Sequence, residues 1–391
     1  LSLGSDRDMR FYHTGSHAYL NVVTGDLNIR TDSTDSAIVC TSNAGVATYH
    51  NAVKKTETTA TGLTVTGSVI ADNTPGRNAL INGGMQVSQY PSTNSAINTY
   101  GPLDRWRTIG GPMGYTISQV TDGTNYPNTH NALKAHRTAG NTQEYDLGVI
   151  QGIETLNSLP FAGKQCTFSF RARVGANFSG PSSVLKALVW TGTGTDDQPA
   201  SMTNHSSALM TDITVSTTAT KYSVTYTIPS SVTQITCGVY YQCRGTAGAN
   251  DWFEITDCQF EVGPVATDFE IRDYGYELAR CQRYYETHNH LTTAKTTDGS
   301  VTSQWSTITS NDSNTLVVST GINYKVPKSA SHTVTLYNPS DTTTAARANA
   351  QGTERTVTAT YGGPNALSRI YVSGAAAGNY VTYNWEASAE L

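Results

Sequence analysis

The sequence predicts an almost all-β fold, and three observations carry that prediction. Apolar and polar residues alternate with period two through most of the chain, as they do in half-buried strands. Turn signals rich in Gly, Asn and Asp separate these stretches. Charged residues make up only 14% of the 391-residue chain, while Tyr dominates the aromatics with 22 copies against 8 Phe and 5 Trp. Tyr suits half-buried strand positions, so the composition agrees with the alternation.

Residues 1–70 predict a strip of short hairpins. Met9–Phe11, Leu27–Ile29 and Leu63–Val65 alternate with period two, and turn signals recur about every ten residues. Two-stranded hairpins are marginally stable alone in water, so this strip needs partners to complete a core. Threefold winding of identical chains is one closed solution, and inclusion in a larger monomeric sheet is the alternative. Residues 71–77 contain Pro-Gly and few apolar side chains, and are interpreted as a linker.

Residues 78–272 predict a two-sheet sandwich or jelly roll, because strands alternate with long polar loops and no helical period is present. The strand candidates are Cys166–Ala172, Val184–Trp190, Lys221–Thr227, Ile235–Tyr241 and Trp252–Ile255. Residues 288–391 return to strands and predict a smaller C-terminal β-sandwich. Its candidates are Thr315–Ser319, Thr333–Tyr337, Arg355–Thr360 and Tyr380–Trp385.

A connecting helix is expected over residues 273–287. Tyr274, Leu278, Cys281 and Tyr285 recur at i, i+4, i+7 and i+11, and Asp273 is placed to cap the first turn. These four apolar positions form one face, which we expect to pack around a threefold axis if three chains associate.

Charge, hydropathy and cysteines exclude several classes of protein. The net charge is −5 with no run of Lys and Arg, so nucleic acid is an unexpected partner. No apolar stretch approaches ~20 residues, so no membrane span is expected, and the first residues show no signal peptide. The six scattered cysteines are interpreted as free buried thiols, with a Cys237–Cys243 bridge as the alternative.

Three stretches resemble bacteriophage tail-fibre sequences. The first runs from residues 8–29 into Lys54-Lys55-Thr56-Glu57-Thr58-Thr59 and Gly62–Gly67, and is similar to a stalk segment of marine phage fibres. The second begins with residues 77–87 and Asp104-Arg105-Trp106, which resemble the opening of a jelly roll related to carbohydrate-binding modules, and closes with residues 254–263. The run Glu277-Leu278-Ala279-Arg280-Cys281-Gln282-Arg283-Tyr284-Tyr285 follows it and is characteristic of phage fibres.

The third stretch comprises residues 324–327 and 333–337 and the ending Ala389-Glu390-Leu391, with which such fibres commonly stop. The resemblance implies a homotrimer, a natural C-terminus at the distal tip, contacts with other phage tail proteins and recognition of the host surface. It also implies a virion protein that is assembled in the cytoplasm of the bacterial host. A purely structural fibre or adaptor is the alternative function.

A polysaccharide-degrading tailspike is the enzymatic alternative, which requires two carboxylates about 5–10 Å apart across a cleft. The candidates are Asp196 with Asp197, Asp251 with Glu254, and the trio Asp268, Glu270 and Asp273. Turn formation explains Asp196 and Asp197 better than catalysis does. Helix capping or pairing between chains explains the trio better than catalysis does. No Gly-x-Ser-x-Gly elbow and no phosphate-binding loop occurs. We therefore expect no enzymatic activity.

Receptor binding is expected from exposed aromatic side chains in the C-terminal domain, since aromatic faces stack on sugars. The candidates are Trp305, Tyr337, Tyr361 and Tyr371, with Tyr361 in an expected loop over residues 361–365. Trp385 lies in an alternating strand and is interpreted as core. His288 and His290 share a strand face and are weak metal candidates, because three chains would offer six imidazoles to one cation. No cofactor is expected otherwise.

Overall fold

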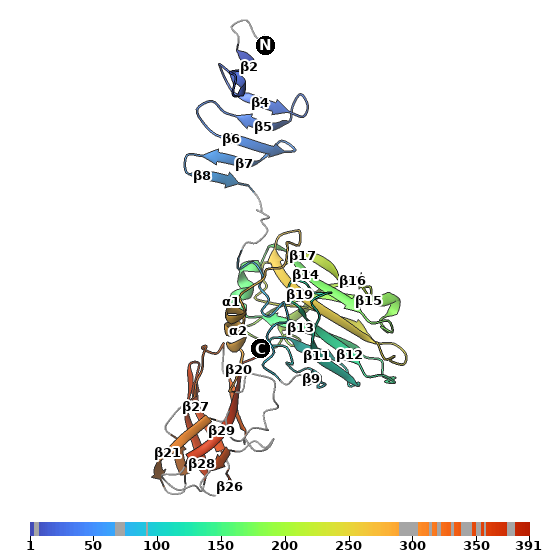
Figure 1. Cartoon of the computed structure of the whole chain (residues 1–391), viewed down its shortest axis with the longest axis vertical. Coiled ribbons are helices and arrows are strands. Elements are labelled where there is room, and N and C mark those ends of the chain that lie inside the picture. Colours follow the sequence, from blue (N-terminus) through green and yellow to red (C-terminus); the bar gives the residue numbers. More distant parts are fainter. Residues whose placement is uncertain are drawn as a thin grey trace. The chain divides into compact units, whose positions relative to one another are not determined.

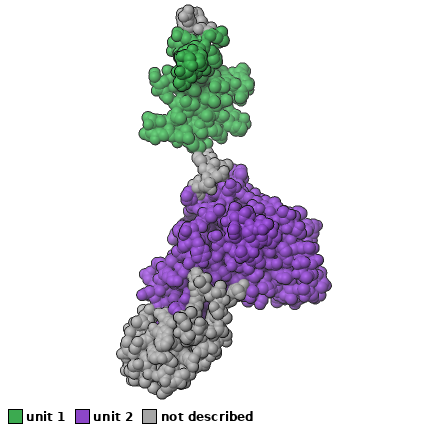
Figure 2. All heavy atoms as spheres, in the orientation of Figure 1, with its two compact units in different colours: residues 1–71 green, residues 72–391 purple. Residues whose placement is uncertain are grey.

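The structure, a computed structural model, describes most of the 391-residue chain. The described residues are 1–3, 8–66, 75–90, 93–288, 304–312, 315–318, 322–329, 332–337, 346–348, 353–355, 357–373 and 380–391. The chain divides into two compact units, residues 1–71 and residues 72–391 (Figure 2). Residues 71–74 of the expected linker lie outside the described residues.

The first unit consists of two small antiparallel sheets, each a meander in sequence order (Figure 1). Its strands are β1 (Ser2–Leu3), β2 (Met9–His13), β3 (Ala18–Val22), β4 (Leu27–Arg30), β5 (Ser36–Cys40), β6 (Val46–His50), β7 (Val53–Thr59) and β8 (Gly62–Val65). The strands are short because turns such as the one at Gly25, which has φ +79°, interrupt them. The prediction of hairpins over this segment is confirmed.

The first unit has almost no interior of its own. Among its described residues, Ala47 is the one buried hydrophobic side chain. Phe11, Ile29 and Leu63 are 49%, 46% and 62% exposed. A single-layer sheet leaves large apolar side chains exposed to water, which is unfavourable.

The second unit contains an antiparallel β-sandwich, as predicted (Figure 1). One sheet has five strands in the order β10 (Arg107–Gly110), β13 (Asp146–Ile153), β18 (Gln234–Gln242), β15 (Val184–Thr193) and β16 (Thr203–Thr214). The other has six in the order β17 (Thr220–Thr227), β14 (Gln165–Val174), β19 (Trp252–Val262), β12 (Asn131–Arg137), β11 (Tyr115–Thr121) and β9 (Thr93–Asn94). The predicted strands of residues 166–255 fall within β14, β15, β17, β18 and β19.

The core of the sandwich follows from strict alternation along these strands. Leu185, Ala187 and Val189 of β15 are at most 1% exposed and face Phe168, Phe170 and Phe253 of the other sheet within one cluster. Cys237 and Val239 of β18 join the same cluster. The intervening residues of β15 and β18 therefore point to the outer face of the five-stranded sheet. All six cysteines are free thiols, so the Cys237–Cys243 bridge is not formed.

The connecting helix is shorter than expected. Helix α2 spans Tyr274–Gln282, and the Asp273 carboxylate accepts hydrogen bonds from the backbone N–H groups of Gly275 and Tyr276, as a cap should. Tyr285 does not belong to the helix but begins strand β20 (Tyr285–Thr287), which pairs with β29 (Tyr380–Ser388). The helix ends early because the backbone of residues 285–287 bonds to β29. Two shorter helical segments, α1 (Thr155–Ser158) and residues 159–161, were not predicted.

The strands after α2 form one connected sheet of ten strands around β29. Besides β20 and β29 it contains β21 (Gln304–Asp312), β22 (Thr315–Val318), β23 (Ile322–Asn323), β24 (Thr333–Tyr337), β25 (Ala346–Ala348), β26 (Thr353–Arg355), β27 (Val357–Gly363) and β28 (Ala366–Ser373). The first half of β29 pairs with β21 and β25, and its second half pairs with β20 and β24. This one strand therefore changes neighbours along its length.

The last three residues return to the sandwich. Leu391 packs in a cluster with Ile81, Val87, Cys281 and Tyr284. Figure 1 shows the C-terminus beside α2 and β20. The final residues therefore fill the joint between the sandwich and the ten-stranded sheet.

Candidate functional site

The outer face of the five-stranded sheet carries large apolar side chains that are only partly covered. Met210 is 49% exposed, and Ile109, Trp190 and Tyr240 are half-buried, whereas Ile150 and Leu188 are buried. Register sets Ile109, Gly148, Tyr240, Lys186 and Asp212 side by side across β10, β13, β18, β15 and β16. The next row on this face is Arg107, Ile150, Gly238, Leu188 and Met210. Partly exposed apolar side chains gathered on one face indicate a binding surface.

Two glycines shape this face, because a side chain at either position would collide with its neighbours. A Cβ at Gly148 would lie 2.3 Å from the Cβ of Tyr240, and a Cβ at Gly238 would lie 2.2 Å from the carbonyl oxygen of Val149. Such distances are not compatible with an unmoved backbone. Because these glycines have no side chains, the backbone is exposed between the neighbouring aromatic residues and the face is hollowed there.

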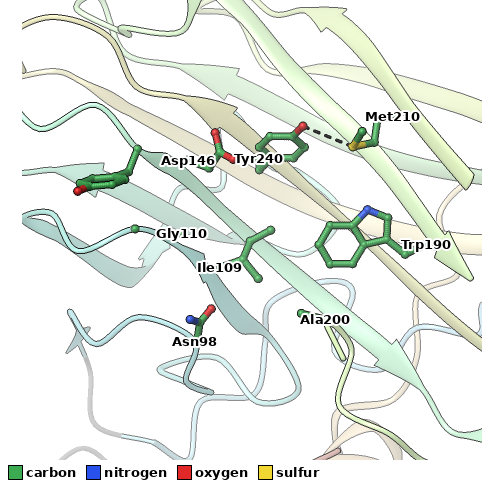
Figure 3. A pocket seen from close by; sticks show the side chains of 10 residues that line it. Asn98, Ile109, Gly110, Asp146, Trp190, Ala200, Met210 and Tyr240 are labelled. Atoms are coloured by element: carbon green, nitrogen blue, oxygen red, sulfur yellow. Dashed lines mark hydrogen bonds between the residues drawn. The ribbon is translucent and has the colours of Figure 1, made fainter. Parts of the chain in front are cut away.

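A trough of about 480 Å³ lies on this face (Figure 3). Its volume falls within the roughly 300–1,000 Å³ range of small-molecule sites. The lining residues are Asn98, Ile109, Gly110, Gly111, Tyr145, Asp146, Trp190, Ala200, Met210 and Tyr240. They come from all five strands of the sheet, from the loops before and after β10, and from the loops before β13 and before β16.

Three aromatic rings are spread along the trough. Trp190 lies opposite Thr236 of β18. The carbonyl of Tyr145 accepts a hydrogen bond from the N–H of Cys243, just after the end of β18. Trp190 and Tyr145 are therefore seven residues apart when both are measured along β18 and its continuation. At 3.4 Å per residue this is a distance of ~24 Å. Tyr240 lies between Asp146 and Trp190 (Figure 3). This arrangement suits an extended ligand that passes over several rings in turn.

The aromatic rings are held in place by local contacts. The Tyr240 hydroxyl donates to the Met210 sulfur at 3.5 Å, and burial raises the pKa of that hydroxyl, so it stays protonated at neutral pH. His205 stands edge to face against Trp190, with ring centroids 5.1 Å apart. The Trp190 Nε1 atom is buried and has no partner among the described residues, so this ring offers apolar surface rather than a donor.

The residues predicted for receptor binding are not assembled into this site. Trp305 lies in β21, Tyr361 in β27 and Tyr371 in β28, and the structure describes only their backbone. Tyr361 belongs to a strand and not to the expected loop, because the turn between β27 and β28 is confined to Pro364 and Asn365. Tyr337 is described fully, and its hydroxyl donates to Glu386 at 2.5 Å.

Two of the four side chains predicted to pack around a threefold axis are buried within the chain itself. Cys281 is fully buried, and Tyr285 is 2% exposed with its ring stacked on Tyr90 at 3.7 Å. Neither leaves surface for a neighbouring copy. Leu278 packs against the Cys281 cluster, and Tyr274 is 45% exposed.

The carboxylates considered for hydrolysis, apart from Asp268, each have a structural contact. Asp196 accepts from the Thr155 N–H, and Asp197 accepts from Thr203, as turn residues do. Asp251 pairs with the buried Arg137 at 3.3 Å, and Glu254 pairs with Arg173 at 2.7 Å. In the remaining trio, Glu270 accepts from the N–H groups of Gly76 and Asn78, Asp273 caps α2, and Asp268 is exposed.

The metal candidates are only partly described. His288 lies with its ring 6.4 Å from that of Trp385, and His290 lies outside the described residues. Within the described part of the chain, no three His, Cys, Asp or Glu side chains come together as a metal site would require. No helix in that part is long and apolar enough to cross a membrane.

Sequence reasoning overlooked the trough although both of its central strands were predicted. The sequence did contain a sign of it, because β15 and β18 carry apolar residues on both faces. Leu188, Trp190 and Tyr240 lie on the face that points away from the core. A strand with two apolar faces is either covered on both sides or binds something on one.

Comparison with known proteins gave matches among solved structures. The chain matches no protein-family model and no curated protein sequence. Among solved structures it is similar to the enzymatically active domain of tailspike protein 4 of bacteriophage CBA120, with 14% identity over 49% of this chain and 22% of that chain and a TM-score of 0.32. A family 4 carbohydrate-binding module gives 14% identity over 46% and 98% of the two chains, with a TM-score of 0.29.

A further similar structure is the C-terminal family 22 carbohydrate-binding module of Clostridium thermocellum Xyn10B, with 16% identity over 45% of this chain and all of that one and a TM-score of 0.28. This chain therefore covers less than a quarter of the tailspike and nearly all of each module. The protein is a β-sandwich protein with a trough on the outer face of its five-stranded sheet.

Proposed function

We propose that this chain is a subunit of a bacteriophage tail fibre that binds a glycan on the surface of the host cell without catalysis. The observation that carries the proposal is the aromatic trough, in which Tyr145, Tyr240 and Trp190 follow one another over a polar rim. Aromatic faces cover the apolar faces of sugar rings, while amide and carboxylate groups exchange hydrogen bonds with their hydroxyls. The resemblance of three stretches of the sequence to phage fibres supports the tail-fibre part.

Homotrimer formation through residues 1–71 is part of the same proposal. Exposed apolar side chains on a single-layer sheet support it, because threefold association would bury them. Three copies of one weak glycan site then raise the avidity of the fibre by ~10²–10⁴. The protein acts within the virion, attached to other tail proteins.

Binding of the purified chain to a glycan microarray tests the proposal. We expect Trp190→Ala and Tyr240→Ala each to weaken binding at least ~10-fold, since each removes a ring from the trough. The control is Trp252→Ala, which removes an aromatic residue of β19, outside the lining of the trough, that packs under Lys134 at 4.3 Å. If both trough variants bind as wild type does, the glycan site lies elsewhere in the chain. If the wild-type chain binds no glycan, the proposed function is wrong.

A further inference from the structure

Two polar side chains line the trough, an amide and a carboxylate, and both are uncommitted. Asn98 and Asp146 are exposed, and no described residue pairs with either side chain. Burial raises the pKa of the Tyr240 hydroxyl, Lys186 acts against that rise, and the Asp146 carboxylate is close enough for its negative charge to add to it. A free carboxylate therefore sits next to the central ring of the trough.

None of the cations near the trough belongs to its lining, although the buried Arg107 Nη1 atom has no partner among the described residues. Lys186, beside Tyr240 on the same face, contacts Asp212 at 2.5 Å. Arg244, beyond the Tyr145 end, contacts Glu144 at 3.3 Å. Arg107 lies one row from Ile109 and is only 8% exposed, and neither it nor His205 belongs to the lining. Among the lining residues that the structure describes there is no Lys, Arg or His.

An acidic sugar placed over Tyr240 would meet the charge of Asp146, and no cation among the described lining residues would offset that charge. Removing an anion from water without a partner is strongly unfavourable, and the repulsion adds to that cost. A neutral sugar meets no such penalty. Its hydroxyls can donate to Asp146, and Asn98 can both donate and accept.

Resting on the proposed glycan-binding role of the trough, we propose that its ligand is an uncharged polysaccharide chain and that Asp146 is the residue that rejects acidic sugars. The ~24 Å between the rows of Tyr145 and Trp190 is a length that a run of several sugar rings would cover and a single sugar would not. Asp146 then sets selectivity by charge, while the three rings set affinity.

Matched polymers test this inference. Polygalacturonate and alginate are compared with their carboxyl-reduced forms, which keep the linkages and lose the charge, and with neutral glucan, mannan, galactan and xylan in affinity electrophoresis. We expect wild-type protein to bind neutral polymers and to prefer each reduced form over its acidic parent by about tenfold or more. Asp146→Asn keeps the shape of the side chain and should narrow this preference to about twofold.

The control is Glu57→Gln, which changes the net charge equally but lies in the first unit, paired with Lys54. It should leave the preference unchanged. Equal or stronger binding of the acidic parents, or the same effect from Glu57→Gln, overturns the charge rule while glycan binding stands. A chain retarded by none of these polymers and by no microarray glycan overturns the proposed function itself.

Discussion

Arg105 and Glu390 form an ion pair inside the joint between the sandwich and the ten-stranded sheet, with side chains only 1% and 4% exposed. The same guanidinium donates to the carbonyl of Gly152 at 2.9 Å and lies 3.5 Å above the ring of Tyr284. It thus joins the sandwich, the end of α2 and the last residues of the chain. The Ala389-Glu390-Leu391 ending therefore stabilises this joint, through the ion pair of Glu390 and the packing of Leu391.

Arg105→Met should lower the free energy of unfolding by about 3–5 kcal/mol, because it leaves the buried Glu390 carboxylate without its partner. Chemical denaturation measures this. The double variant Arg105→Met with Glu390→Gln removes both charges and should recover most of the loss. As a surface control, Arg244→Met breaks an exposed pair and should cost below about 1 kcal/mol. Equal losses for Arg105→Met and Arg244→Met would contradict the buried-pair argument.

Stability should depend on pH through Asp104, which is fully buried beside this pair. Burial raises the pKa of the Asp104 carboxyl to about 7, although Gln89 donates to it from its backbone N–H and its side chain. The native state therefore holds a proton that the unfolded chain releases near pH 4. The contribution of Asp104 to the free energy of unfolding is fully present below pH 4. It is lost as the pH rises towards 7, by at most about 1.4 kcal/mol per pH unit.

Denaturation of wild type and Asp104→Asn across pH 4–8 measures this dependence. We expect the difference between the two proteins to change over pH 4–7 and to level off above it. The neighbouring Glu390 also has a raised pKa, chiefly through burial, and contributes in the same direction in both proteins. A difference that is flat with pH would show that Asp104 titrates normally.

Local patterns sufficed for some elements of the fold. Alternation located β14, β15, β17 and β18 within a few residues, and Asp273 marked the start of α2. The end of α2 was missed because Tyr285 continues the helical spacing by coincidence while its backbone pairs with Ser388, about a hundred residues later. Strand pairing between residues so far apart in the sequence cannot be recognised from the residues around Tyr285 alone.

The trough was missed for the same physical reason. Trp190 and Tyr240 come together because β15 and β13 both pair with β18, an order that differs from the order in the chain. Asp146 reaches Tyr240 only through that order. The C-terminal aromatics drew attention because they lie among Gly and Asn, which is a local cue. Sequence reasoning thus predicted the kind of side chain that binds a glycan, but it placed the site in another domain.

Gly238→Ala should destabilise the sandwich by about 1–3 kcal/mol, since the new Cβ would lie 2.2 Å from the Val149 carbonyl oxygen and 2.8 Å from Ile150. Thermal unfolding measures it. Gly363→Ala is the matched control, because nothing lies within 4 Å of its Cβ position and its φ is not in the left-handed range. That variant should be neutral or slightly stabilising. A Gly238→Ala protein as stable as wild type would mean that the sheet shifts freely at this point.

Association of the chain should depend on the apolar side chains of the first unit. Light scattering should give a mass three times the 41.9 kDa of one chain. Leu63→Asp, at a position 62% exposed in the single chain, should reduce that mass, because a charge would be buried between copies. Leu156→Asp is the control, since Leu156 is 77% exposed and lies on α1 of the second unit. A wild-type mass of 41.9 kDa would contradict threefold association and leave the trough as a site of a single chain.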